Sequence, residues 1–155
     1  MLIHLRELVT PNNISILFLC TGNSCRSQIA EGIARKILPN YINIYSAGVE
    51  AHGINPNAIN TMAEINIDIS KQTSKTIDLN DINQYDLIIT LCGDARDNCP
   101  VLKGKNKHMH WDLIDPAKLV GNEEYILSEF AKVRDKIIEN MELLQNEIGS
   151  HEIFS

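Results

Sequence analysis

The sequence predicts an α/β fold with a doubly wound, mostly parallel sheet. Short apolar runs at residues 14–19 and 86–91 have the composition of buried strands. The segments between and after them show the three- and four-residue apolar spacing of helices, and this alternation favours parallel strands joined by right-handed crossovers. In such sheets the ligand lies beyond the carboxyl ends of the strands. Because Cys20, Cys92 and Asp115 all follow predicted strands, we expect them to face one mouth.

The composition indicates a single globular domain. The chain has 155 residues, and its hydrophobic and charged contents of 44% and 22% are ordinary. A net charge of -6 argues against a nucleic-acid binder, and no apolar run approaches the length of a membrane span. Residues 1–10 make a poor signal peptide, so we expect a cytoplasmic, reducing location. There, four cysteines indicate catalysis, redox exchange or metal binding rather than a disulfide framework.

The first half of the chain predicts two strands and two helices. The strand 14–19 leads into a loop at 20–25 and a helix at 26–38, in which isoleucines recur every four residues. Residues 41–46 alternate apolar and polar side chains, which is typical of a strand. Pro56 suits the first turn of a second helix, because a helix start does not need its missing N–H.

The second half predicts two more strands and a long helix. Residues 68–79 are polar and rich in serine and threonine, which indicates a surface connection. The apolar run 86–91 is expected of a central parallel strand buried on both faces, and residues 105–111 predict another strand. In residues 123–148 apolar side chains recur at three- and four-residue steps opposite a charged side, which predicts an amphipathic helix.

The stretch that begins at Cys20 has the composition of an anion-binding loop. A strand–loop–helix unit directs the loop N–H groups and the positive end of the helix at one point. Cys20 lies in that field as a candidate nucleophile, and the Arg26 guanidinium matches two oxygens of a tetrahedral oxyanion. The alternative is a small core cysteine followed by a Gly-Asn turn. The residues predicted to bind the anion are Thr21, Gly22, Asn23, Ser24, Cys25, Arg26 and Ser27.

A pair of cysteines follows the predicted strand 86–91. Cys92 and Cys99 lie in a short polar loop and can form a disulfide if it folds back to bring their α-carbons within about 7 Å. Asp94 and Asp97 disfavour thiolates beside them, so the pair suits taking over a disulfide better than initiating chemistry. The alternatives are two unrelated cysteines and a zinc site, for which the ligand spacings are poor.

The remaining candidates are one carboxyl group and three histidines. Asp115 precedes Pro116, and a carboxyl group held over an anion pocket can protonate a leaving oxygen. Taken alone, an Asp-Pro pair most often marks a turn. No partner pattern accompanies His52, His108 and His110, which we interpret as solvated or core residues.

The loop and the downstream aspartate together resemble a known family. Cys20, five intervening residues and an Arg-Ser pair, with Asp115 before a proline, resemble the low-molecular-weight tyrosine phosphatase fold. The strings CTGNSCRSQIAEG, YSAGVEAHGINPNAI, DISKQTS, LIITLCGD and NCP resemble thioredoxin-coupled arsenate reductases built on that fold. The resemblance implies one three-layer α/β/α domain over residues 14–150, with a mostly parallel four-stranded sheet. It leaves residues 1–13 as an extension, either a frayed helix or a disordered lead.

The resemblance also implies a three-cysteine relay without a bound cofactor. Cys20 attacks arsenic while the loop and Arg26 hold the oxygens, and Asp115 protonates the departing hydroxyl. Cys92 then attacks Cys20, which releases arsenite, and Cys99 takes over the disulfide. Reduced thioredoxin, the implied partner and electron donor, reduces the bond between the last two cysteines.

Three loop residues are assigned supporting roles. We expect Ser27 to hydrogen-bond to Cys20, and Asn23 to brace the loop because asparagine tolerates a left-handed backbone conformation. The resemblance makes Cys25 dispensable for the relay, and we interpret it as structural.

We expect no metal. Some relatives bind potassium through residues that match Asn23, Glu31 and Ser46 together with an acidic residue. Lys75 stands at the acidic position, and its ammonium group would repel the ion and take its place.

Three functions compete. The first is arsenate reduction, accompanied by weak phosphatase activity. The second is hydrolysis of phosphotyrosine, phosphoarginine or a small phosphate ester, with Cys92 and Cys99 incidental. The third is a non-catalytic oxyanion or redox sensor, against which the general acid argues. The two cysteines favour the reductase, for which the family expectation is a monomer.

Overall fold

A computed structural model describes residues 13–92 and 106–150, which contain a four-stranded parallel sheet. The inner strand β1 (Ile14–Cys20) pairs in parallel with a neighbour on each side, so that Ile16 lies opposite both Ile44 and Leu87. The mostly parallel sheet and the α/β fold class predicted from the sequence are confirmed. Across the sheet the strands are β2 (Ile42–Gly48), β1 (Ile14–Cys20), β3 (Leu87–Thr90) and β4 (Lys107–His110).

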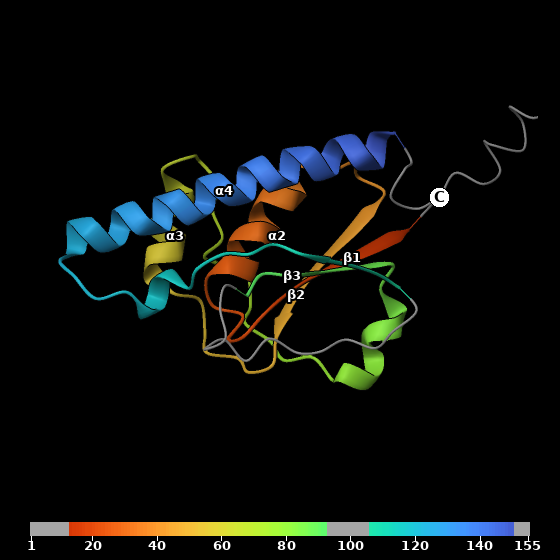
Figure 1. The fold of residues 1–155 in the computed structure, drawn as a ribbon, viewed down its shortest axis with the longest axis horizontal. Coiled ribbons are helices and arrows are strands. Elements are labelled where there is room, and N and C mark those ends of the chain that lie inside the picture. Colours follow the sequence, from red (N-terminus) through yellow and green to blue (C-terminus); the bar gives the residue numbers. More distant parts are fainter. Residues whose placement is uncertain (1–12, 93–105, 151–155) are drawn as a thin grey trace, which may run out of the picture.

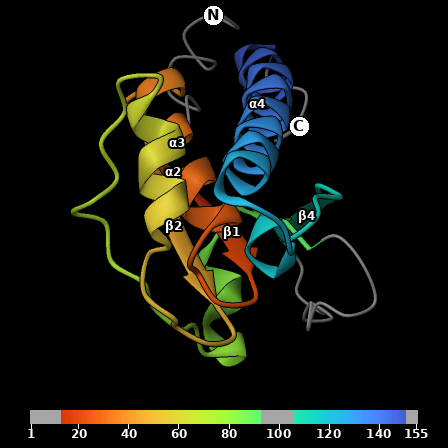
Figure 2. The ribbon, with the colours of Figure 1, turned by 90° about the vertical axis from the view of Figure 1, so that its left-hand side faces the viewer.

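Three helices lie together on one face of this sheet (Figures 1 and 2). They are α2 (Arg26–Ile37), α3 (Pro56–Ala63) and α4 (Glu123–Gly149), and α4 packs across both others. The main apolar core lies between these helices and the sheet, and it includes fully buried Phe18 and Phe130. Within the described residues, no helix combines the length and the apolarity that a membrane span requires.

The opposite face carries a thinner third layer, made by the 3₁₀ helix η1 (Leu79–Gln84) over a smaller cluster that includes Leu17 and Ile88. Figure 1 shows this helix in green on the side away from α4. The sequence predicted a polar surface connection at residues 68–79 and did not predict this helix. Of its six residues only Ile82 is buried, so the sequence has no apolar periodicity from which this helix could be predicted.

Side-chain caps begin two of the helices where the sequence expected them. The Asn55 side chain accepts a hydrogen bond from the N–H of Asn57 at 2.8 Å, and Pro56 occupies the first turn. The Asn122 side chain accepts from the N–H of Tyr125 at 2.8 Å at the start of α4. These caps satisfy N–H groups that the first helical turns leave without partners.

We predict that Phe18→Ala lowers the free energy of unfolding by about 3–5 kcal/mol, because it removes a fully buried ring and leaves a cavity. Urea unfolding followed by the fluorescence of Trp111, whose ring lies 5.8 Å from that of Phe18, measures the loss. Leu143→Ala is the control, since Leu143 is 58% exposed on α4. Equal losses in the two variants would contradict this account of the core.

Candidate active site

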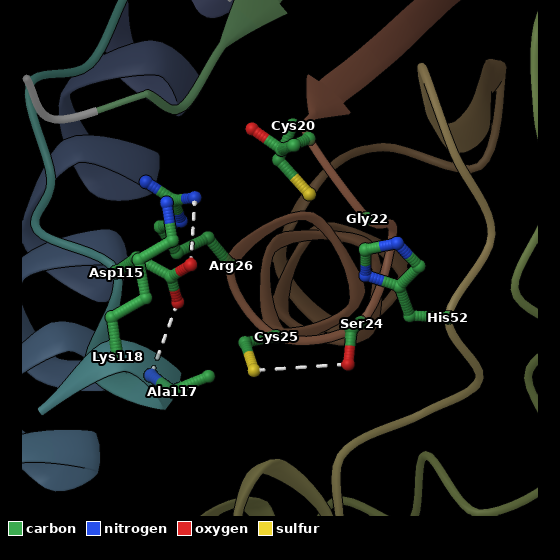
Figure 3. A pocket seen from close by; sticks show the side chains of 10 residues that line it. Cys20, Gly22, Ser24, Cys25, Arg26, His52, Asp115, Ala117 and Lys118 are labelled. Atoms are coloured by element: carbon green, nitrogen blue, oxygen red, sulfur yellow. Dashed lines mark hydrogen bonds and ion pairs between the residues drawn. The ribbon is translucent and has the colours of Figure 1, made fainter. Parts of the chain in front are cut away.

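A pocket lies where β1 ends and α2 begins (Figure 3). Cys20 ends the strand, Arg26 begins the helix, and Cys25 at the N-cap position makes no capping hydrogen bond. Within the described residues, the backbone N–H groups of residues 21–25 donate no hydrogen bond to another part of the protein. Such groups stabilise an anion. The cavity of about 220 Å³ is lined by Cys20, Thr21, Gly22, Ser24, Cys25, Arg26, His52, Asp115, Ala117 and Lys118.

The loop is held from outside through its carbonyl groups. Each of five successive carbonyl oxygens accepts a hydrogen bond from a donor elsewhere in the chain. Because the carbonyls are bound there, the N–H groups on the opposite side of each peptide can face the pocket. The donors and acceptors are the N–H of Glu50 to Thr21 (2.9 Å), of His52 to Gly22 (3.0 Å), of Asn55 to Ser24 (3.1 Å) and of Ile29 to Cys25 (2.9 Å), and Nε2 of Gln28 to Asn23 (3.1 Å).

The side chain of Asn23 directs a hydrogen-bond chain toward the nucleophile. Its Oδ1 accepts from the N–H of Lys75 at 2.8 Å, and because a backbone N–H only donates, the orientation of the amide is set. Nδ2 therefore donates to Oγ of Ser27 at 2.8 Å and of Ser46 at 3.0 Å. Oγ of Ser27 lies 2.8 Å from Sγ of Cys20, and when Cys20 is a thiolate, which only accepts, the Ser27 hydroxyl is the donor. The expected Ser27 contact is present, and Asn23 has the left-handed φ of 47°.

The second branch of this hydrogen-bond network runs from Asn23 through Ser46 and ends at a buried carboxylate. Glu31 is 4% exposed and accepts from Oγ of Ser46 at 2.7 Å. Nζ of Lys75 lies 3.8 Å from its Oε1 and donates to the carbonyl of Thr73 at 2.7 Å. Nε of Arg35 lies 3.4 Å from its Oε2. The Lys75 ammonium thus lies beside the Glu31 carboxylate, and its replacement of a potassium ion stays a prediction. Among the described residues, no group of three or more His, Cys, Asp or Glu side chains could hold a metal ion.

The predicted general acid reaches the pocket from the other end of the chain. Asp115 lies 3.6 Å from the Arg26 guanidinium, which also donates to the carbonyl of Leu113 at 3.0 Å. Oδ1 of Asp115 accepts from the N–H of Ala117 at 3.0 Å and begins the short helix η2 (Pro116–Lys118). This cap fixes the carboxyl group beside the guanidinium, across the pocket from His52 (Figure 3).

The remaining loop residues divide between lining and support. Asn23 and Ser27 are fully buried beneath the pocket and do not line it, because their side chains brace the loop. The Cys25 thiol does line it, and burial, assisted by the Asp115 carboxylate, raises its pKa to about 12. Cys25 therefore stays protonated at neutral pH and is a poor nucleophile. Within the described residues, Oγ1 of Thr21 is buried without a hydrogen-bond partner.

Cys92, the first thiol of the second pair, does not line the pocket. Cys92 is 2% exposed directly after β3 and does not line the cavity, and Cys99 falls outside the described residues. Cys92 nevertheless follows β3 at the edge of the sheet where β1 ends in Cys20, and the expectation that it faces the mouth of the pocket stays a prediction. Leu91 packs in the main core with Cys20, so side-chain alternation directs the next residue, Cys92, toward the other face of the sheet.

Sequence reasoning missed four residues at this site. His52, Ala117 and Lys118 line the pocket, and the Gln28 side chain holds the loop. The short polar pattern around His52 gave no periodic or ligand-spacing signal, although the residue lies within one of the strings that carry the family resemblance.

The anion loop with its cysteine and arginine, and the aspartate beside them, define the class of protein to which this chain belongs. The family model described as low molecular weight phosphotyrosine protein phosphatase matches residues 15–152. The chain belongs to this family, whose fold the arrangement of sheet and loop shares.

Within the family, the chain is similar to arsenate reductases. It is 56% identical over 122 residues to the arsenate reductase of Oceanobacillus iheyensis, covering 79% of this chain and 88% of the relative. A solved arsenate reductase in a phosphate-binding state matches with a TM-score of 0.68 at 33% identity, covering 87% of this chain and 98% of that one. The thioredoxin-dependent arsenate reductase of Corynebacterium glutamicum matches with a TM-score of 0.59 at 25% identity, covering 90% and 67%.

We predict that Ser27→Ala slows the alkylation of Cys20 by iodoacetamide at neutral pH by about tenfold or more. The lost hydrogen bond to a charged sulfur contributes about 1.5–3 kcal/mol. Peptide mapping by mass spectrometry gives the rate for this one cysteine. Ser128→Ala removes an exposed serine hydroxyl on α4 and should leave the rate unchanged. Unaltered alkylation in Ser27→Ala would show that the hydroxyl does not stabilise the thiolate.

We predict that Cys25 makes the protein less stable in alkali. Its raised pKa means that the thiol stays protonated in the folded state while the unfolded chain ionises above 9.0. The stability it contributes is complete below that value and is lost as the pH rises toward about 12. Between about pH 8 and about pH 10 the loss is about 1.4 kcal/mol. Urea unfolding at both pH values should show this extra loss in wild type relative to Cys25→Ala. Parallel pH dependences would contradict it.

Proposed function

We propose that this chain is a thioredoxin-dependent arsenate reductase that works in the reducing cytoplasm. The observation that carries the proposal is the placement of Cys20 at the centre of an anion pocket, flanked by Arg26 and Asp115. The similarity to arsenate reductases over most of their length supports the choice of arsenate.

The first step forms a sulfur–arsenic bond. Arsenate enters the loop and takes over the Arg26 donors that now contact Asp115 and the carbonyl of Leu113. The Cys20 thiolate attacks arsenic, and an As–O bond breaks. Asp115 donates a proton to the departing hydroxide, which leaves as water. Arsenic remains in the +5 state, so this step needs no reductant.

The second step reduces arsenic. The Cys92 thiolate attacks the sulfur of Cys20, the S–As bond breaks, and its electron pair goes to arsenic, which leaves as arsenite in the +3 state. Cys99 attacks Cys92 in turn, which moves the disulfide and frees Cys20. Two electrons from thioredoxin then reduce the Cys92–Cys99 bond. Because Cys92 is buried outside the pocket, the step also requires this residue to move toward Cys20.

The thioredoxin partner is supported by the Corynebacterium glutamicum relative, which is thioredoxin-dependent. The two-electron balance requires a thiol reductant of this kind, since the proposed relay ends each cycle as a disulfide.

A phosphatase is the alternative, because Cys20, Arg26 and Asp115 are sufficient for phosphoryl transfer to sulfur and then to water. Two features argue against an aryl phosphate as the main substrate. None of the described residues that line the pocket is a phenylalanine, tyrosine or tryptophan, and a phosphatase does not need Cys92 or Cys99. We therefore propose phosphatase activity only as a weak side reaction.

We predict that Cys92→Ser and Cys99→Ser each abolish arsenate-dependent NADPH consumption in the presence of thioredoxin and its reductase. Either change breaks the relay after the first sulfur–arsenic bond has formed. Asp115→Asn should lower the rate by about 10²–10⁴-fold, as expected for loss of a general acid.

Hydrolysis of p-nitrophenyl phosphate is the matched control. It requires only the loop chemistry, so both cysteine variants should retain it within a small factor. Arsenate turnover that survives both cysteine substitutions would exclude the relay, and turnover that is absent from wild type would exclude the reductase.

A further inference from the structure

We propose that His52, held by Glu50, determines the specificity of the pocket by favouring a free tetrahedral oxyanion over an organic phosphate ester. The inference deepens the proposed function and rests on it only for the identity of the preferred anion as arsenate. It concerns the rim of the pocket, not the nucleophile or the general acid.

The first observation is the close approach of the His52 ring to the loop. The His52 N–H donates to the carbonyl of Gly22 at 3.0 Å, which brings the imidazole over the same residue. A Cβ atom added to Gly22 would lie 2.5 Å from Nδ1 of that ring. Only glycine leaves room for this contact, so the ring lies directly against the loop backbone and lines the pocket (Figure 3).

The second observation is that Glu50 holds the ring from outside. Oε2 of Glu50 lies 2.5 Å from Nε2 of His52, and the N–H of Glu50 donates to the carbonyl of Thr21 at 2.9 Å. Both residues are therefore tied to the loop through their backbone. A carboxylate only accepts hydrogen bonds, so Nε2 carries a proton and, in the neutral ring, Nδ1 is an acceptor on the side of the loop.

The third observation is the geometry of the opening. Asp115, Ala117 and Lys118 line the pocket on the side opposite His52 (Figure 3). An oxyanion held by the loop directs its fourth substituent out between these two walls. In arsenate or inorganic phosphate this substituent is an oxygen, whereas in an ester it is an organic group that must pass the imidazole.

Two physical effects then act in the same direction. The fixed ring narrows the path of a bulky substituent, and its Nδ1 can accept a hydrogen bond from the hydroxyl that protonated arsenate carries and an aryl phosphate dianion lacks. A site that hydrogen-bonds a substrate hydroxyl discriminates strongly against a ligand without one. Among the described residues that line the pocket there is no phenylalanine, tyrosine or tryptophan to compensate with a large stacking surface.

Binding of two non-reacting anions tests the proposal. Isothermal titration with inorganic phosphate and with benzylphosphonate gives a ratio of dissociation constants for the full-length protein. We expect His52→Ala to shift this ratio by about tenfold toward benzylphosphonate. His108→Ala is the matched control. His108 is another exposed histidine, it lies on β4, and its Nε2 is 2.8 Å from Oδ1 of Asn106. It should leave the ratio unchanged.

Two further variants separate orientation from bulk. Glu50→Gln keeps an acceptor for Nε2 and should preserve the ratio, whereas Glu50→Ala releases the ring and should shift it in the same direction as His52→Ala. An unchanged ratio in His52→Ala, or an equal loss of both ligands, would overturn the proposal. Phosphate and benzylphosphonate bind without arsenate reduction, so failure of the reductase assay alone would leave this test unaffected.

Discussion

The amide of Asn23 is the interaction on which the anion loop depends. A left-handed backbone at this residue turns the loop, and the amide binds the N–H of Lys75 on one side and two serine hydroxyls on the other. One of these hydroxyls reaches Cys20 and the other ends on the buried Glu31. Because a backbone N–H only donates, whereas a carboxylate and a thiolate only accept, the protons of the chain have defined directions once Cys20 is a thiolate. The nucleophile is thereby oriented by contacts made from the base of the loop, not from the pocket.

The same logic explains why the loop presents N–H groups. Five carbonyls are bound from outside the loop, three of them by the sequence-distant residues 50–55 and two by Gln28 and Ile29 of the adjoining helix α2. The chain following β2 therefore has two functions, since it fixes the loop and supplies His52 to the rim. On the opposite wall, the ion pair of Arg26 with Asp115 couples the loop to the segment that carries the acid. Binding an anion and placing the proton donor are linked through one guanidinium group.

Much of this architecture follows from local pattern. Apolar runs identified β1 and β3, alternation identified β2, three- and four-residue spacing identified the helices, and Pro56 marked a helix start. Each of these signals reflects burial or backbone chemistry within one element. The loop was predictable for the same reason, since Cys20 and Arg26 lie six positions apart. The helix η1 was not predictable, because its packing depends on a single buried isoleucine.

The sequence by itself determined the class of fold, the family, and the thiol, guanidinium and carboxyl groups on which the proposed chemistry rests. The tertiary structure alone decided which groups meet. It brought Asp115 to Arg26 across 89 positions, pressed His52 against Gly22, and buried Cys92 outside the pocket. The physical reason is that composition and spacing report burial along one element, whereas contacts between elements depend on strand register and side-chain alternation across the sheet.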